Sequence, residues 1–212
     1  MTTYAYALGE ALYLNLTSAC TLACVFCPKI RDDDWVVGGY DLRLSRAPSA
    51  DEVWDQVLRA GLAGRPEVVF TGLGEPTRRL SVLLEITRRL VDAGVARVRL
   101  DTDGLASLRE GRDVIPEMAR AGLGALVVSL NAPDSATYVR LCPNQYGEAA
   151  WEAARDFLRS AAGCIPDVEA SFVGVPGLDA EACRMEAERL GARFRLRPYD
   201  RVGRLKEQGG NA

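Results

Sequence analysis

Six apolar segments of strand length alternate with amphipathic segments of helical period along almost the whole chain. The strand segments are 11–17, 67–72, 96–104, 125–131, 168–175 and 192–199. The helical segments are 48–64, 79–93, 113–121, 135–141, 148–162 and 179–191. Such alternation predicts an α/β fold with parallel strands and helices outside. We expect an incomplete (β/α)6 barrel, with a doubly wound open sheet as the alternative; either fold puts its site at the C-terminal ends of the strands.

The length and the ends of the chain bound its organisation. The chain has 212 residues, which suits one compact domain. We assign residues 1–202 to this domain and the polar, glycine-rich residues 203–212 to a flexible tail. The first residues lack the basic region of a signal peptide, and no apolar run is long enough to span a bilayer. We therefore expect a cytoplasmic protein with no membrane partner and with reduced thiols.

One face of the expected sheet is unusually polar. In segment 96–104, Arg99 and Asp101 alternate with apolar residues. In segment 192–199, three arginines alternate with Phe194 and Leu196, which should meet the outer helices; the arginines are Arg193, Arg195 and Arg197. Parallel strands normally read as apolar on both faces. The pattern favours a lumen that holds a polar ligand, and the alternative is an exposed edge strand with solvated arginines.

Three cysteines follow the first long strand segment with the spacing C-x3-C-x2-C. Cys20, Cys24 and Cys27 account for half of the six cysteines in a chain without histidine. Structural zinc sites use four ligands. A [4Fe–4S] cluster held by three thiolates leaves one iron open for an external ligand. The motif therefore indicates such a cluster, against the alternatives of buried small residues or a metal-stabilised interaction module.

This motif at the end of the first strand of a β/α repeat resembles the radical S-adenosylmethionine (SAM) enzymes, from Tyr13 to about Tyr199. The resemblance implies a [4Fe–4S] cluster and SAM as cofactors, with SAM chelating the open iron. One electron then cleaves SAM to methionine and a 5′-deoxyadenosyl radical, which takes a hydrogen atom from the substrate. It also implies an electron donor such as flavodoxin or ferredoxin.

Further positions match this family one by one. Phe26 corresponds to the aromatic residue near adenine, and the turn with Gly72, Gly74 and Glu75 to the motif that receives the SAM amino group. Leu73 separates glycines that are adjacent in the family. The resemblance implies contacts with ribose or the methionine end for four more residues, with Asp103 replacing an asparagine: Thr102, Asp103, Ser129 and Asn131. Taken alone, each of these segments also reads as an ordinary strand-end turn.

A narrower resemblance covers four segments, 38–44, 72–80, 129–142 and 194–199. Together they are similar to the small radical SAM proteins associated with TatD-family nucleases. That resemblance supplies neither a reaction nor a substrate.

The sequence thus predicts an enzyme that cleaves SAM reductively and abstracts hydrogen from a small anionic substrate, because arginine pairs well with carboxylate or phosphate. The substrate candidates are Asn15, Tyr40, Arg99, Arg195, Arg197 and Cys142. Cys142 either packs or donates a hydrogen atom. The alternative is a radical SAM enzyme that acts on a protein or a nucleic acid. A net charge of −3 gives nucleic acid little support.

Overall fold

The computed structural model describes residues 2–199 and is built around one seven-stranded sheet. The strand order is β1-β2-β5-β6-β7-β8-β9, with β1 antiparallel to β2 and every later pairing parallel. The strands are β1 (Ala5–Leu8), β2 (Ala11–Leu14), β5 (Val68–Phe70), β6 (Val98–Thr102), β7 (Ala125–Ser129), β8 (Asp167–Gly174) and β9 (Arg193–Pro198). The prediction of six parallel strands in an α/β fold is confirmed.

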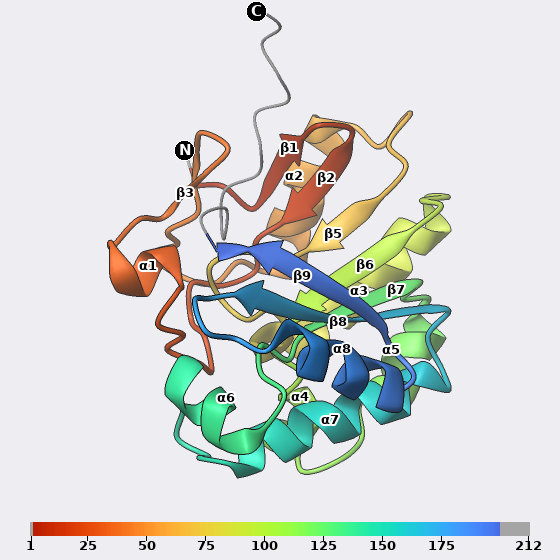
Figure 1. Cartoon of the computed structure of the whole chain (residues 1–212). Helices are drawn as coiled ribbons and strands as arrows, with labels where there is room; N and C mark the ends of the chain where they lie inside the picture. The colour runs from red at the N-terminus through yellow and green to blue at the C-terminus, as the bar shows by residue number, and fades with distance from the viewer. Residues whose placement is uncertain (1, 200–212) are drawn as a thin grey trace, which may run out of the picture.

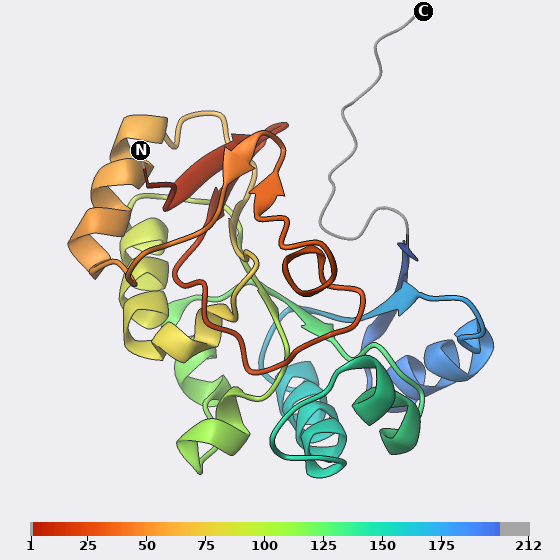
Figure 2. The same ribbon diagram turned by 90° about the vertical axis from the view of Figure 1, so that its left-hand side faces the viewer.

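Helices cover the outside of the curved sheet, and one long segment lies across its open end (Figures 1 and 2). The helices are α1 (Pro28–Arg31), α2 (Ala50–Ala60), η1 (Pro76–Arg79), α3 (Leu80–Asp92), α4 (Ala106–Glu110), α5 (Ile115–Ala121), α6 (Ser135–Leu141), α7 (Ala149–Ala162) and α8 (Ala180–Arg189). Figure 2 looks onto the end toward which the strands point, and residues 15–48 cross it. A small hairpin, β3 (Val36–Val37) and β4 (Tyr40–Asp41), belongs to this segment.

The main core lies between the sheet and the helices. The apolar face of β2 and the following residue, Leu12, Leu14 and Leu16, is fully buried. At the start of α2, Ser49 accepts a hydrogen bond from the Glu52 backbone, and the Glu52 side chain accepts one from the Ser49 backbone. This reciprocal pair is the expected capping box, which satisfies N–H groups that the helix itself leaves free.

Four short elements are absent from the sequence prediction: β1, α1, α4 and the hairpin β3-β4. Each spans at most five residues, too few for a hydrophobic period to show. β1 is held instead by its antiparallel pairing with β2, in which Tyr6 lies opposite Tyr13 and their rings stack at 5.6 Å. The predicted domain, residues 1–202, ends beyond the last described residue. The predicted tail, residues 203–212, lies outside the described residues.

β9 differs from its predicted environment. Phe194 packs as expected, with its ring 5.6 Å from that of Phe172, but Leu196 is 43% exposed. The prediction that Leu196 meets an outer helix is wrong. Among residues 2–199, β9 pairs only with β8, so Leu196 lies on a strand at the edge of the described sheet.

Candidate active site

A cavity of about 400 Å³ opens where the parallel strands end, beneath the segment 15–48. The strand-end side chains that sequence reasoning selected converge there. The wall includes Cys20, Cys24, Phe26, Cys27, Gly72, Gly74, Glu75, Arg99, Thr102, Asp103, Ser129, Asn131, Arg195 and Arg197. The wall does not include three other candidates, Asn15, Tyr40 and Cys142.

The loop with the three cysteines is tied down on both sides. Lys29 donates to the Ser18 carbonyl at 3.0 Å, and the Cys27 carbonyl accepts from Arg31 at 2.9 Å as α1 begins. Burial raises the pKa of Cys20 to about 12, and it also raises the pKa of Cys27. The thiols are therefore protonated in the absence of a metal group. Binding iron would release these protons, since the thiolate is the ligand.

The Gly72–Pro76 turn approaches the cysteine loop too closely for side chains. A β-carbon on Gly74 would lie 1.9 Å from the Thr17 carbonyl oxygen, which is backbone and cannot swing away. Gly72 has a φ of 148°, and a β-carbon there would lie 2.8 Å from Oδ1 of Asn15. Both glycines are thus required by position, whichever ligand the turn contacts.

Glu75 links the end of β5 to the end of β6. Its Oε1 accepts from the Thr77 backbone at 2.9 Å, from the Thr77 hydroxyl at 2.6 Å and from the Thr102 hydroxyl at 2.7 Å. Its Oε2 accepts from the Asp103 backbone at 2.7 Å. The buried carboxylate therefore orders the two strand-end loops, and Oε2 keeps most of the remaining acceptor capacity for a ligand.

Asp103 presents one carboxylate oxygen to the cavity. Oδ1 accepts from the Leu105 backbone at 2.8 Å and lies 3.6 Å from the Arg109 guanidinium. Oδ2 is buried without a hydrogen-bond partner among the described residues, although the nearby Thr21 side chain also acts on the pKa of this carboxyl and lowers it. Burial, with the nearby charge of Glu75, raises the pKa of Asp103 to about 7, although Arg109 opposes the shift. Near neutral pH this group can therefore be donor or acceptor.

The raised pKa of Asp103 predicts a pH-dependent stability. An aspartate with a higher pKa in the folded state than in the unfolded chain binds its proton more tightly when folded. The stability that this tighter proton binding contributes to the folded state is therefore lost as pH rises from about 4 through 7. In the cluster-free protein, the free energy of unfolding of the wild type should fall by about 2–4 kcal/mol between pH 5 and pH 8, relative to that of the Asp103→Asn variant. Urea unfolding at both pH values measures this difference, and an identical pH dependence in the two proteins would contradict the shifted pKa.

Two buried polar atoms face the cavity from neighbouring strands. Asn131 has the positive φ of 59°, and its Nδ2 donates to the Ser129 carbonyl at 3.1 Å, while Oδ1 has no partner within residues 2–199. The Ser171 hydroxyl is buried and unpartnered in the same part of the chain. Sequence reasoning did not select Ser171. The signal was present, because Ser171 follows Glu169 on the inward face of β8 and is paired in register with Ser129 of β7.

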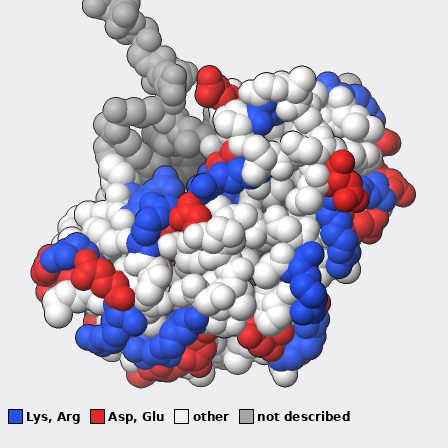
Figure 3. Space-filling view, turned by 90° about the vertical axis from the view of Figure 1, so that its right-hand side faces the viewer, with Lys and Arg blue, Asp and Glu red and all other residues white. Residues whose placement is uncertain are grey.

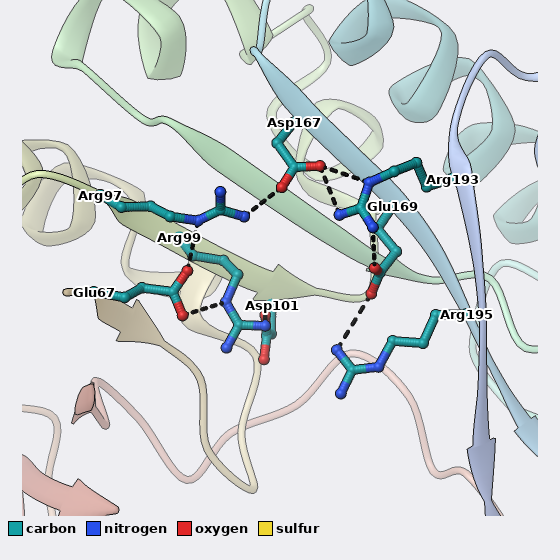
Figure 4. A network of polar contacts seen from close by, with 8 residues as sticks. All are labelled: Glu67, Arg97, Arg99, Asp101, Asp167, Glu169, Arg193 and Arg195. Carbon is teal, nitrogen blue, oxygen red and sulfur yellow. Dashed lines mark hydrogen bonds and ion pairs between the residues drawn. The ribbon is translucent and has the colours of Figure 1, made fainter. Parts of the chain in front are cut away.

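An ion-pair network closes the opposite end of the barrel, where the strands begin (Figure 4). Asp167 contacts both Arg97 and Arg193. Glu169 lies 3.2 Å from both Arg193 and Arg195. A second, polar cavity of about 210 Å³ lies among these side chains, and in Figure 3 basic and acidic groups are interspersed on this face. The network explains how several arginines are accommodated on one face of the sheet without mutual repulsion.

The network leaves one arginine of the inner face unpaired. Arg99 is bound to Glu67 at 3.2 Å and to Asp101 at 3.4 Å, and Arg195 is bound to Glu169. Within the described part of the chain, Arg197 has no ion pair, and its buried Nε has no hydrogen-bond partner. Burial lowers the pKa of Arg197, with Asp101 opposing the shift, and burial raises the pKa of Asp101. Arg197 is thus an unsatisfied donor on the cavity wall.

The remaining candidates lie behind or beside the wall. Asn15 is buried, and its Nδ2 donates to the Leu42 carbonyl at 2.9 Å, so the side chain joins β2 to the segment that crosses the cavity. Tyr40 is on the exposed hairpin, with its ring 5.4 Å from that of Tyr6. Cys142 is fully buried behind the cysteine loop.

The sequence profile of the Radical SAM superfamily matches residues 14–190. The chain belongs to the radical SAM superfamily. The chain is therefore an enzyme of the radical SAM class, whose cofactors are a [4Fe–4S] cluster and SAM and which needs a reductant. Three thiols and several unpartnered polar atoms on one cavity wall suit these groups. Among residues 2–199, no helix is long and apolar enough to cross a membrane.

Curated relatives of this radical SAM chain include RNA methyltransferases. A probable dual-specificity RNA methyltransferase RlmN from Parafrankia sp. is 32% identical over 161 residues, which cover 65% of this chain and 40% of the relative. A probable RNA methyltransferase from Sorangium cellulosum is 35% identical over 136 residues, which cover 58% of this chain and 30% of the relative. The chain thus spans well under half the length of these relatives.

Solved structures of radical SAM proteins share the fold. A radical SAM methyltransferase from Sphaerobacter thermophilus matches with a TM-score of 0.61 and 23% identity, over 91% of this chain and 57% of that chain. Methylornithine synthase matches with a TM-score of 0.59 and 14% identity, over 89% of this chain and 53% of that chain. These matches agree with the predicted incomplete barrel. The narrower resemblance to TatD-associated proteins stays a prediction, since these comparisons do not show it.

Proposed function

We propose that this radical SAM enzyme abstracts hydrogen from a small substrate whose anionic group binds Arg197. In this proposal Cys20, Cys24 and Cys27 hold the cluster, and SAM lies on the adjacent wall of the 400 Å³ cavity. The bound cofactors supply one electron and the 5′-deoxyadenosyl radical that takes the hydrogen atom. The chain's own residues then have to bind, orient and enclose SAM and substrate.

The unpartnered atoms of the wall support this placement of SAM. SAM carries an ammonium group, ribose hydroxyls and a carboxylate. Acceptors are available at Asp103 Oδ2 and Asn131 Oδ1, and the Ser171 hydroxyl can donate or accept. A ligand that forms hydrogen bonds with these buried atoms is stabilised by them, because a buried polar atom without a partner is costly. Phe26 and the glycine turn supply apolar surface and close backbone approach.

The unpaired state of Arg197 is the observation that carries the substrate class. Its neighbours Arg193 and Arg195 are neutralised by Asp167 and Glu169. Arg197 is half-buried with a buried, unpartnered Nε, and a partly desolvated guanidinium without an anion of its own gains free energy when a ligand provides one. A carboxylate or phosphate can bind arginine through two parallel hydrogen bonds, which would also fix the substrate's orientation toward the radical.

Substitution of Arg197 tests this assignment. Arg197→Met should lower substrate-stimulated 5′-deoxyadenosine formation by about tenfold or more, because a charge-assisted hydrogen bond is lost. Arg197→Lys should rescue only part of the loss, since a point charge cannot make the two-pronged contact. The assay uses reduced, cluster-loaded protein with deuterated small carboxylates and phosphates, and scores deuterium in 5′-deoxyadenosine.

The matched control is Arg193→Met, which removes an arginine from the same strand face but outside the 400 Å³ cavity. It should leave stimulation unchanged. Equal stimulation in the Arg197→Met and wild-type proteins would remove the anion-binding role.

The second candidate substrate is RNA. The specific observation in its favour is the 32–35% identity to probable RNA methyltransferases. Two observations weigh against it: the match covers 30–40% of those proteins, and the chain as a whole has a net charge of −3. A separate arm with total bacterial RNA and SAM labelled in its methyl group distinguishes the two. RNA-dependent methyl transfer from labelled SAM would establish the second candidate.

A further inference from the structure

A fourth cysteine lies directly across from a member of the cysteine motif. The Ala23 backbone donates to the Pro143 carbonyl at 2.9 Å, and the Val25 backbone donates to the Leu141 carbonyl at 3.0 Å. Leu22 and Asn144 form an antiparallel bridge in the same register. Cys24 and Cys142 are therefore opposite each other, between the two hydrogen-bonded pairs. Side chains come closest at such positions of an antiparallel pair.

The contacts of Cys142 fit a sulfur-to-sulfur interaction. Cys142 is fully buried, and its side chain lies on the same side of the paired backbone as that of Cys24. On its other side, Nδ2 of Asn131 donates to the Cys142 sulfur at 3.6 Å. Because Asn131 is a donor to this sulfur, the S–H group of Cys142 remains available to donate toward a thiolate at Cys24. A short series of side chains thus leads from Asn131, on the cavity wall, through Cys142 to Cys24.

The backbone holds this arrangement in place. The Cys142 backbone donates to the Tyr138 carbonyl at 2.7 Å at the end of α6. The residue after it is Pro143, which has no N–H of its own to offer to the pairing. Cys142 is consequently fixed by the end of a helix and by two backbone hydrogen bonds to the cysteine loop.

We propose that Cys142 is a positioning residue that donates a hydrogen bond from its thiol to the Cys24 thiolate in the cluster-loaded protein. Hydrogen bonds to the sulfurs of an iron–sulfur cluster are among the factors that set its reduction potential. The reduced cluster carries one more negative charge than the oxidised cluster. A donor at Cys24 stabilises the reduced form more and so favours transfer of an electron from the external reductant to the cluster, the step that precedes SAM cleavage. The inference rests on the proposed cluster ligands.

The test is an anaerobic redox titration of the loaded protein, followed by electron paramagnetic resonance. Cys142→Ala should make reduction at least tenfold less favourable, a shift of about 59 mV or more to lower potential for a one-electron couple. Cys142→Ser keeps a donor and should stay closer to the wild type. Cys142→Val fills the space without a donor and repeats the alanine measurement if that variant folds poorly. Cys183→Ala, another fully buried cysteine, is the matched control and should not shift the potential.

Two results would overturn the inference. A potential in Cys142→Ala and Cys142→Val equal to that of the wild type would show that the thiol only packs. Loss of iron from both variants, with thermal unfolding like that of Cys183→Ala, would make Cys142 an iron ligand instead. Failure of the underlying cluster assignment has a different signature, because it would appear as full iron loading when Cys24 itself is replaced.

Discussion

Replacing Cys24 with alanine is expected to abolish SAM cleavage and to remove the [4Fe–4S] cluster. Cys24 lines the cavity between Cys20 and Cys27, and the cavity wall includes no other cysteine among the described residues. Three thiolates already leave one iron of the cluster without a protein ligand. With only two thiolates, the protein would no longer hold the cluster in place. Iron and sulfide analysis after anaerobic reconstitution, together with 5′-deoxyadenosine production, measures both effects.

Two other cysteines serve as controls for this experiment. Cys164 is exposed, and Cys183 is a buried residue of α8. Alanine at either position should leave iron content and SAM cleavage at the wild-type level. Full iron loading in the Cys24→Ala protein would refute the assignment of the ligands.

Gly74→Ala is expected to destabilise the protein by about 3 kcal/mol or more, because the new methyl group would overlap backbone atoms. The atom nearest to the added methyl group is the Thr17 carbonyl oxygen, at 1.9 Å, and the Ala19 carbonyl oxygen is 2.9 Å away. Relief requires the cysteine loop to move away from the turn after β5. Urea unfolding should therefore show a lower midpoint, and iron uptake should fall in the fraction that still folds.

Gly163→Ala is the matched control for the loss of a glycine. Gly163 has a negative φ of −89°, and the nearest contact of an added β-carbon is at 3.9 Å. This variant should be as stable as the wild type or slightly more stable, since alanine restricts the unfolded chain. A Gly74→Ala protein as stable as Gly163→Ala would show that the two loops are not packed as described.

The repeated strand-helix pattern was sufficient to predict the sheet, because long periodic segments depend little on tertiary contacts. Segments such as α3, in which Leu83, Ile86 and Leu90 share one buried face, follow directly from the helical period. The short elements β1 and β3-β4 could not be predicted in this way. They are hairpin strands of two to four residues, held by pairs such as Tyr6 with Tyr13, and such strands are too short for a hydrophobic period to show.

For the candidate site, sequence reasoning gave positions but not partners. Strand ends brought Glu75, Asp103 and Asn131 to one cavity, as parallel topology requires. The sequence did not show that Glu169 would neutralise Arg195 while Arg197 stays unpaired among the described residues. It also did not show that Cys142 would lie opposite Cys24, because that register is set by hydrogen bonds between loops far apart in the sequence.

The central claim is that three thiolates hold one cluster whose open iron takes SAM in the cavity. The most direct measurement is anaerobic incubation of the reduced, reconstituted protein with SAM, followed by quantification of iron, methionine and 5′-deoxyadenosine. We predict about four irons per chain, as a single [4Fe–4S] cluster requires, with methionine and 5′-deoxyadenosine in equal amounts. A protein that carries this cluster and binds SAM, yet forms neither product under reduction, would contradict the account.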